Sequence, residues 1–341
     1  MATRQEILSQ TEILKNVKKE YEHIIKPLKD SLKTNNYEEI GFVGCGTSYY
    51  LAMGLAYNVS RLSDGKIRTR AYTGSELAFG LTQINKNTLV IGLSRSGEST
   101  ETVNALVRVK KVSGASTACI TCSPQSSMVE KSDYPASMGF IHEQSIVMTQ
   151  SFTSMAFLGS ILFHEIYKND HIEYMEEIIT SSDKLIENMQ EQFQQKNIKE
   201  MNHFVFLGYD EYFAAAMEGL VKSTEMALSE VDVFPTLEYR HGPKAKVHKG
   251  TLVFVLPNHI MYNEEIRVAE EISQLGGEVI VVSPKKETRF PLIDYPYTKN
   301  DFSDWFLRVI PLQWLGYNIA IAKNLDPDKP KNLDKVVQLE E

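Results

Sequence analysis

The sequence repeats one pattern twice, and this internal repetition restricts the possible folds more than any other feature of the chain. Each copy begins with a short apolar run that ends in glycine, Ile40–Gly44 in the first half and Phe204–Gly208 in the second. Two further runs recur in the same order, Thr88–Leu93 with Thr251–Leu256 and Ala118–Pro124 with Glu278–Pro284. Repetition at a fixed order indicates two copies of one structural unit.

Strand-like runs alternate with helix-like stretches. In the first half, helices are predicted over Ser48–Arg61 and Glu101–Val112, and a further strand over Ile67–Ala71. This alternation is typical of a parallel sheet covered by helices on both faces. We therefore predict an α/β fold with two tandem, doubly wound domains of the flavodoxin-like type.

The domain boundaries follow from where these patterns begin and end. An N-terminal helix is predicted over Thr3–Lys26, and Pro27 is expected to end or kink it. The polar, proline-containing C-terminus is expected to form an extended tail. The predicted segments are an N-terminal helical segment at 1–36, domain 1 at 37–165, a helical linker at 166–199, domain 2 at 200–325 and the tail at 326–341.

Composition excludes several classes of protein. Hydrophobic residues make up 43% of the chain, which permits a buried core, and the net charge of -8 argues against general nucleic-acid binding. No apolar run reaches the ~20 residues that cross a bilayer. The N-terminus is polar and charged, unlike a secretory signal. We expect a cytoplasmic protein that binds neither membrane nor nucleic acid.

The cysteines are expected to be structural. The chain has three, Cys45, Cys119 and Cys122, which indicates a reducing compartment. Cys119 and Cys122 have the spacing of a redox pair, but they lie in a strand-like run and not at a helix N-terminus, where a thiolate would be stabilised. No His, Cys or Asp cluster has metal-ligand spacing, so neither a metal nor a cofactor is expected.

Two loops carry the features of a phosphate site. Gly44–Ser48 and Ser94–Thr100 each place hydroxyls and a glycine between a strand and a helix, where free N–H groups favour anions. The serines could instead only cap these helices. The two common nucleotide-binding motifs are not matched. The dinucleotide motif Gly-x-Gly-x-x-Gly fails because Tyr49 stands in place of its last glycine, and the Gly-Lys-Ser/Thr sequence of a Walker loop is absent. The second repeat has Pro257–Ile260 in place of Ser94–Thr100, and we expect it to have lost its binding loop.

A charged helix and a stiff loop follow in the second repeat. Glu218, Lys222 and Glu225 lie on one face of a helix predicted over Met217–Ser229. These three charged residues could simply face solvent and form one ion pair. Their apolar neighbours favour instead a cleft, in which the pKa values of the charged residues would be shifted. His241 follows in the loop Phe234–Pro243, where it could transfer protons near neutral pH.

These segments together resemble the SIS (sugar isomerase) family in its two-domain form, including the isomerase half of glucosamine–fructose-6-phosphate aminotransferase. Five segments carry the resemblance along nearly the whole chain: Gly44–Ser48, Ser94–Glu98, Glu218–Glu225, Arg240–Pro243 and Asp328–Lys335. A glutamine-hydrolysing domain, which the aminotransferase has, is not expected here.

The resemblance implies a role for each matching residue. Glu225 corresponds to the base that moves a proton between C1 and C2, His241 to the ring-opening histidine lent by a partner subunit, and Lys335 to the lysine that forms a Schiff base. Arg95 and Ser99 depart from the aminotransferase, which has Gln and Thr there, and the segment Glu143–Thr153 aligns loosely with a sugar-contacting loop. Glu218 and Lys222 correspond to supporting residues, and the expected phosphate binders are Gly46, Thr47, Ser48, Ser94, Arg95, Ser96 and Ser99.

The function implied by this set is a deaminase/isomerase that converts an amino-sugar 6-phosphate such as glucosamine 6-phosphate to the keto sugar and ammonia. The alternatives are a fructosamine-6-phosphate deglycase, an aldose–ketose isomerase and a sugar-phosphate sensor without catalysis. A homodimer with a shared active site and a tail that reaches it are also expected. The sequence does not distinguish the sugar epimer or the nitrogen substituent.

Overall fold

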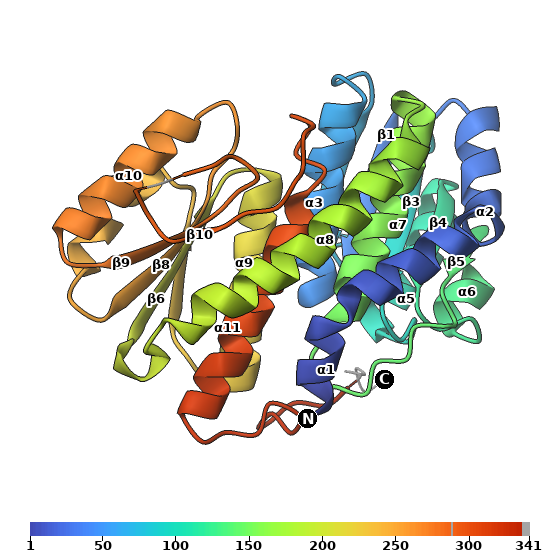
Figure 1. The fold of residues 1–341 in the computed structure, drawn as a ribbon. Helices are drawn as coiled ribbons and strands as arrows, with labels where there is room; N and C mark the ends of the chain where they lie inside the picture. The colour runs from blue at the N-terminus through green and yellow to red at the C-terminus, as the bar shows by residue number, and fades with distance from the viewer. Residues whose placement is uncertain (288, 336–341) are drawn as a thin grey trace. The chain divides into compact units, whose positions relative to one another are not determined.

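The computed structural model describes residues 1–287 and 289–335, and these residues form two compact units. The first unit consists of residues 12–144 and 148–175 together with Asp334 and Lys335, and the second of residues 1–11, 145–147 and 176–333. Each unit contains one sheet (Figure 1). Residues 336–341 of the predicted tail lie outside the described residues.

The sheet of the first unit is entirely parallel, with the strand order β2-β1-β3-β4-β5. The sequence pattern did not predict β5, a short edge strand that pairs only with β4 and contains Pro135. Proline is tolerated at a sheet edge because its missing N–H is not needed there. The strands are β1 (Glu39–Gly44), β2 (Arg68–Thr73), β3 (Thr88–Ser94), β4 (Ser116–Thr121) and β5 (Tyr134–Ser137).

The sheet of the second unit repeats this topology. It is parallel throughout, and its order β10-β9-β8-β6-β7, read from the β7 end, matches that of the first sheet strand for strand. Its strands are β6 (His203–Gly208), β7 (Val231–Phe234), β8 (Thr251–Leu256), β9 (Glu278–Val282) and β10 (Leu292–Ile293). The predicted α/β fold with two tandem doubly wound sheets is therefore confirmed.

The turns after the first strand of each repeat are alike in backbone detail. A Cβ atom on Gly44 would lie 2.4 Å from the carbonyl oxygen of Ser48, and one on Gly208 would lie 2.8 Å from the backbone of Tyr212. The next helix in each case is preceded by a residue with positive φ, Gly46 at 53° and Asp210 at 50°. The glycines at the strand ends are thus required by the close approach of the following helix.

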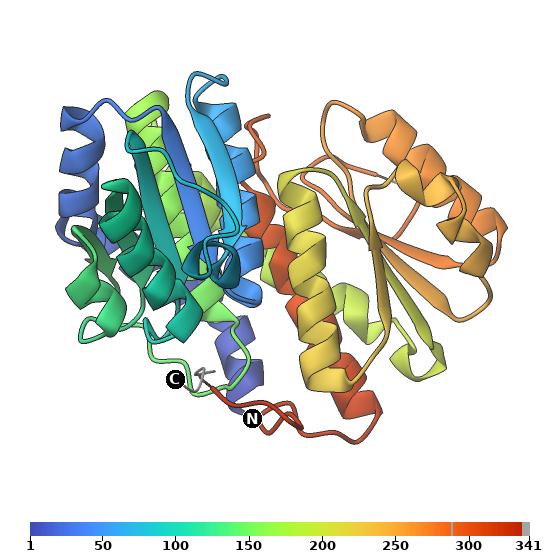
Figure 2. The same ribbon diagram turned by 180° about the vertical axis from the view of Figure 1, so that it is seen from behind.

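Helices cover both faces of the first sheet (Figures 1 and 2). On one face α3 (Thr47–Leu62) contacts α7 (Gln150–Tyr167), and on the other α4 (Gly74–Ala78) and α6 (Ser127–Lys131) contact α5 (Thr100–Ser113). The core beneath α5 contains Cys119, and burial raises the pKa of both the Cys119 and the Cys122 thiols. The prediction that these cysteines are core residues is confirmed.

In the second unit, α9 (Glu211–Ala227) and α11 (Val309–Ala322) cover one face of the sheet, and α10 (Tyr262–Gln274) covers the other. Gly219 and Gly316 permit a close approach of α9 and α11, because a Cβ atom on either would meet the facing helix within 3.0 Å. Four short 3-10 turns complete the unit: η1 (Ile198–Glu200), η2 (Glu238–Arg240), η3 (Pro243–Lys246) and η4 (Trp305–Arg308).

The N-terminal helix departs from its prediction. It is broken at Ser9 into α1 (Ala2–Leu8) and α2 (Gln10–Thr34), and α2 continues through Pro27 to Thr34. The expectation that Pro27 ends the helix is wrong. Ile25 and Leu28 on either side of the proline are fully buried, and their packing offsets the lost backbone hydrogen bond. α8 (His171–Gln194) is the other long helix. Among the described residues, no helix combines the length and apolar character needed to span a membrane.

Candidate active site

The two hydroxyl-bearing loops of the first unit emerge at the same edge of its sheet. They follow β1 and β3, which are hydrogen-bonded neighbours with Val43 opposite Gly92. This is where the strand order reverses, the usual ligand position in a doubly wound sheet. In the first loop Gly46 is exposed, and Thr47 and Ser48 are buried at the start of α3.

The loop after β3 gathers three hydroxyl groups. The Ser94 Oγ lies 3.5 Å from the Ser96 Oγ and 3.3 Å from the Ser99 Oγ, and it accepts a hydrogen bond from the Gly97 N–H at 3.1 Å. Gly97 has a φ of 68°, and a Cβ atom there would lie 2.2 Å from the Ser126 Oγ. The tight turn therefore needs glycine, and it concentrates donors at the N-terminus of α5, a suitable cradle for an anion.

The Arg95 side chain forms an ion pair with a buried carboxylate. Its guanidinium lies 3.0 Å from Glu143, whose side chain is 1% exposed. Glu143 also accepts hydrogen bonds from the Thr149 N–H at 2.7 Å and from the Ser151 hydroxyl at 2.5 Å. Arg95 was predicted to bind phosphate, and this role of Glu143 was not predicted. The only signal was the loose alignment of Glu143–Thr153 with a sugar-contacting loop.

The tail lysine lies beside the same group of residues. The Lys335 Nζ donates to the Glu143 carbonyl oxygen at 2.5 Å, and the Arg95 guanidinium donates to the Lys335 carbonyl oxygen at 3.3 Å. Although Lys335 is 240 residues from Arg95 in the sequence, both belong to the first unit. The amine thus lies against the 143–151 loop, and the Arg95 side chain links the backbone of the tail to the loop that carries Ser94, Ser96 and Ser99.

Replacing Arg95 by methionine is expected to loosen the 143–151 loop and the tail together, because one guanidinium bonds to both. An unpaired buried acceptor costs about 1–3 kcal/mol. Amide hydrogen exchange in peptides covering both segments should therefore accelerate roughly 5- to 150-fold. The exposed Lys131→Met, in the same unit, is the matched control. Unchanged exchange at the tail in Arg95→Met would contradict the bridging role.

In the second unit, α9 carries a buried charge cluster. The Lys222 Nζ lies 3.3 Å from Glu218 and 2.5 Å from Glu225. Lys222 and Glu218 are fully buried, whereas the Glu225 side chain is 24% exposed. Burial lowers the pKa of Lys222, but the two carboxylates outweigh it and the pKa is raised overall. The lysine therefore stays charged and leaves Glu225 as the carboxylate that solvent or substrate can reach.

His241 lies at the surface of the second unit. It follows η2, its backbone N–H donates to the Glu238 carbonyl oxygen at 3.0 Å, and the next residue, Gly242, has a φ of 126°. Its side chain is exposed. The loop is thus built of two 3-10 turns, and it leaves the imidazole exposed.

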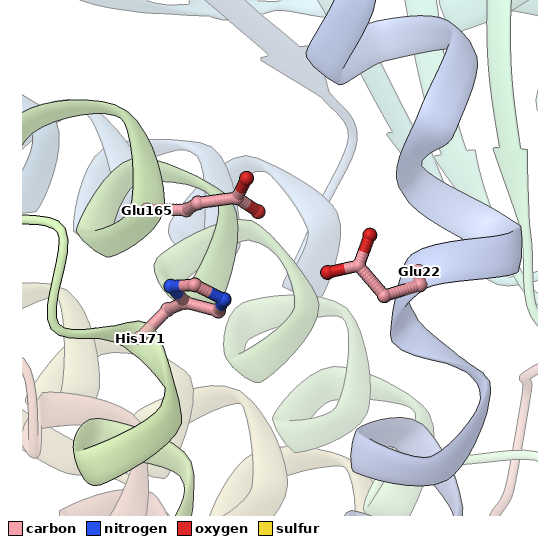
Figure 3. A group of neighbouring side chains, drawn as sticks. All are labelled: Glu22, Glu165 and His171. Atoms are coloured by element: carbon pink, nitrogen blue, oxygen red, sulfur yellow. The ribbon is translucent and has the colours of Figure 1, made fainter.

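One group of side chains has the composition of a metal site. Ligand atoms of Glu22, Glu165 and His171 lie within 4.8 Å of one another in the first unit (Figure 3). The Lys29 ammonium already lies 2.5 Å from Glu22 and 3.3 Å from Glu165, and Lys33 lies 3.0 Å from Glu165. Because two lysines neutralise the carboxylates, this cluster is explained as a network of ion pairs between α2 and α7.

Comparison with known proteins identifies the family of the chain. Residues 35–165 match the SIS domain family. The crystal structure of glucosamine-6-phosphate deaminase from Thermotoga maritima is 34% identical and superimposes with a TM-score of 0.85, over 99% of this chain and 100% of that one. The chain belongs to the SIS domain family. The resemblance inferred from the five motifs is confirmed.

The curated relatives match this chain over only part of their own length. Glutamine–fructose-6-phosphate aminotransferase (isomerizing) from Francisella tularensis is 28% identical over 89% of this chain and 52% of its own length. The chain thus spans about half the length of the curated relatives it matches. The C-terminal domain of that organism's aminotransferase, with a TM-score of 0.81 at 24% identity over 97% of this chain and 98% of that one, shows the shared fold alone. These relatives are enzymes, and the chain is an enzyme of the SIS family.

Proposed function

We propose that this SIS enzyme is an amino-sugar-6-phosphate deaminase/isomerase that converts glucosamine 6-phosphate and water to fructose 6-phosphate and ammonia. The observation that carries the proposal is that Lys335 is bonded within the unit that holds the serine loop: its amine donates to the Glu143 carbonyl oxygen, and its own carbonyl oxygen accepts from Arg95. A phosphate cradle and an amine within one unit suit a phosphorylated carbonyl compound. The similarity to the Thermotoga maritima deaminase supports the same reaction.

The first steps are binding, ring opening and proton transfer. The phosphate binds to the hydroxyls and N–H groups after β1 and β3 and orients the substrate. His241 assists ring opening, which frees the C1 aldehyde of the amino sugar. Glu225 then removes the proton from C2 and returns it to C1, so that the C2 amine becomes an imine. Lys222 and Glu218 hold the Glu225 carboxylate in place.

The last steps release ammonia. The Lys335 amine attacks C2 of the imine, ammonia leaves, and a Schiff base between Lys335 and the sugar remains. One water molecule hydrolyses this Schiff base to fructose 6-phosphate and the free lysine. Atoms balance with water as the only co-reactant. Because His241 is exposed, we further propose that it acts in the site of a second copy of the chain, in a homodimer.

The reaction is tested by supplying glucosamine 6-phosphate and measuring ammonia and fructose 6-phosphate. We expect the two products in equal amounts. Fructosamine 6-phosphates and plain aldose 6-phosphates are supplied in parallel. Turnover of only the fructosamine 6-phosphates would show a deglycase. Turnover of only the plain aldose 6-phosphates would show an aldose–ketose isomerase. Binding without turnover of any of them would show a sensor and refute the proposal.

Lys335 is tested by chemical trapping. Borohydride reduces a Schiff base to a stable amine, so reduction in the presence of fructose 6-phosphate should add one sugar phosphate to the protein at Lys335. The substitution Lys335→Arg should abolish this adduct while phosphate binding persists. Lys331→Arg, at another exposed position of the tail, is the matched control. An adduct in Lys335→Arg that maps to a different lysine would contradict this assignment.

A further inference from the structure

The second unit has a cavity of its own at the corresponding edge of its sheet. It has a volume of about 180 Å³ and lies where β8 and β9 end, and Pro257, Ser283 and Lys285 form part of its wall. These positions follow the strands that correspond to β3 and β4 of the first unit. Although the second repeat lacks the serine loop, a cavity therefore lies at the carboxyl edge of its sheet.

One wall of this cavity is rigid and electrically balanced. Arg308 is 2% exposed and lies 3.0 Å from the Asp304 carboxylate, and it donates to the Pro257 carbonyl oxygen at 2.7 Å. The Tyr212 hydroxyl also donates to Asp304, at 2.7 Å, and the Arg308 guanidinium lies 3.6 Å from the centre of the Tyr212 ring. Because its charges are paired, this wall is preorganised and supplies shape and an aromatic surface.

The opposite wall offers positive charge. The Lys285 Nζ lies 3.9 Å from the centre of the Tyr262 ring, and in the described part of the chain no carboxylate forms an ion pair with it. Lys299 also lines the cavity. Asp304 is the carboxylate among the described lining residues, and it is already paired, so the Lys285 ammonium at this cavity favours an anionic ligand.

A buried hydroxyl in the same cavity lacks a partner. Tyr262 is 4% exposed, and its hydroxyl makes no hydrogen bond of ordinary geometry within the described residues. Burial raises the pKa of Tyr262 to about 12, and the Ser283 hydroxyl acts in the opposite direction. A buried hydroxyl without a partner is costly, so a polar group that enters the cavity would gain a hydrogen bond.

We propose that this cavity is a second binding site of the chain and that it takes a small sugar phosphate. The phosphate lies against Lys285 and the Tyr262 hydroxyl, and the sugar ring lies against Tyr212 and Tyr297. The volume excludes a dinucleotide, and the lysines disfavour a metal ion. The described lining residues of this cavity belong to the second unit, whereas the cradle after β1 and β3 belongs to the first. The cavity contains none of the proposed catalytic groups, so its ligand acts as an effector.

Calorimetric titration with 1,5-anhydroglucitol 6-phosphate tests the site. This probe has no carbonyl carbon and cannot react, so the result does not depend on the proposed catalysis. We expect two binding events per chain. Ser96→Ala should weaken only the event at the cradle, while Lys285→Gln and Tyr262→Phe should each weaken only the other by about tenfold. Lys286→Gln, at the neighbouring exposed lysine, is the matched control and should keep both.

Two results would overturn this inference. One is a single binding event in the unmodified protein that Ser96→Ala abolishes and Lys285→Gln leaves unchanged. The other is a second event that both Lys285→Gln and Tyr262→Phe retain at full affinity. If the two events are found but no amino sugar is deaminated, the second site stands and only the proposed function fails.

Discussion

Replacement of Lys222 by methionine should lower the free energy of unfolding by about 3–5 kcal/mol, the usual cost of removing one partner from a buried ion pair. Methionine fills a similar volume, so the loss comes from the charge that remains. Glu218 is fully buried, and Lys222 is the cation beside it at 3.3 Å. Glu225 is partly exposed and can be solvated instead. Urea-induced unfolding followed by circular dichroism measures the difference.

The double variant Glu218→Gln, Lys222→Met is the matched control. With both charges removed, it should recover most of the stability that Lys222→Met loses. The effect should be present at neutral pH, because the pKa of Lys222 is raised above its unfolded value and its stabilisation is lost only as the pH rises through that raised pKa. Equal stability of Lys222→Met and the unmodified protein would show that Glu218 is protonated or hydrated in the folded state.

The second large effect is expected for Glu225→Gln, which should lower kcat for glucosamine 6-phosphate roughly 10²- to 10⁴-fold. Glutamine retains the size and polarity of the side chain but cannot accept the C2 proton. KM should change little, because the phosphate cradle belongs to the other unit. Exchange of the C1 proton of fructose 6-phosphate with deuterated water, followed by NMR, should slow by the same factor.

Glu230→Gln is the control for this experiment. Glu230 is an exposed carboxylate shortly after the same helix, and its replacement should leave kcat and the deuterium exchange unchanged. Since Glu225 also pairs with Lys222, the stability of Glu225→Gln is measured alongside. Loss of activity with deuterium exchange intact would assign proton transfer to another group and contradict the role proposed for Glu225.

Most strands were predictable, because buried parallel strands are continuous apolar runs, but the short edge strands β7 and β10, like β5, were not predicted. Phe204–Gly208 and Thr251–Leu256 match β6 and β8 closely. The exceptions have physical reasons. The edge strand β5 is short and contains Pro135, and α2 passes through Pro27 because burial on both sides outweighs a local breaker. Local propensity cannot report such tertiary packing.

The sequence predicted which residues belong to the candidate site, but it did not predict which other residues their side chains contact. The sequence indicated a charged face on α9, and the burial of Lys222 between two carboxylates became visible only in the fold. Arg95 was expected at a phosphate, and its guanidinium lies against Glu143 and the backbone of Lys335. Side-chain direction depends on neighbours that are distant in the chain, so spacing alone does not give it.

The sequence by itself determined the doubled α/β architecture, since apolar periodicity and strand-ending glycines are local properties that each repeat carries in full. It also determined which residues are chemically able to act. Only the tertiary structure decided that Lys335 is bonded to Glu143 and Arg95, and that the second repeat keeps a cavity lined by Tyr262 and Lys285 after losing its serines. Both depend on contacts between distant segments, which are fixed by packing and burial and leave no periodic trace in the sequence.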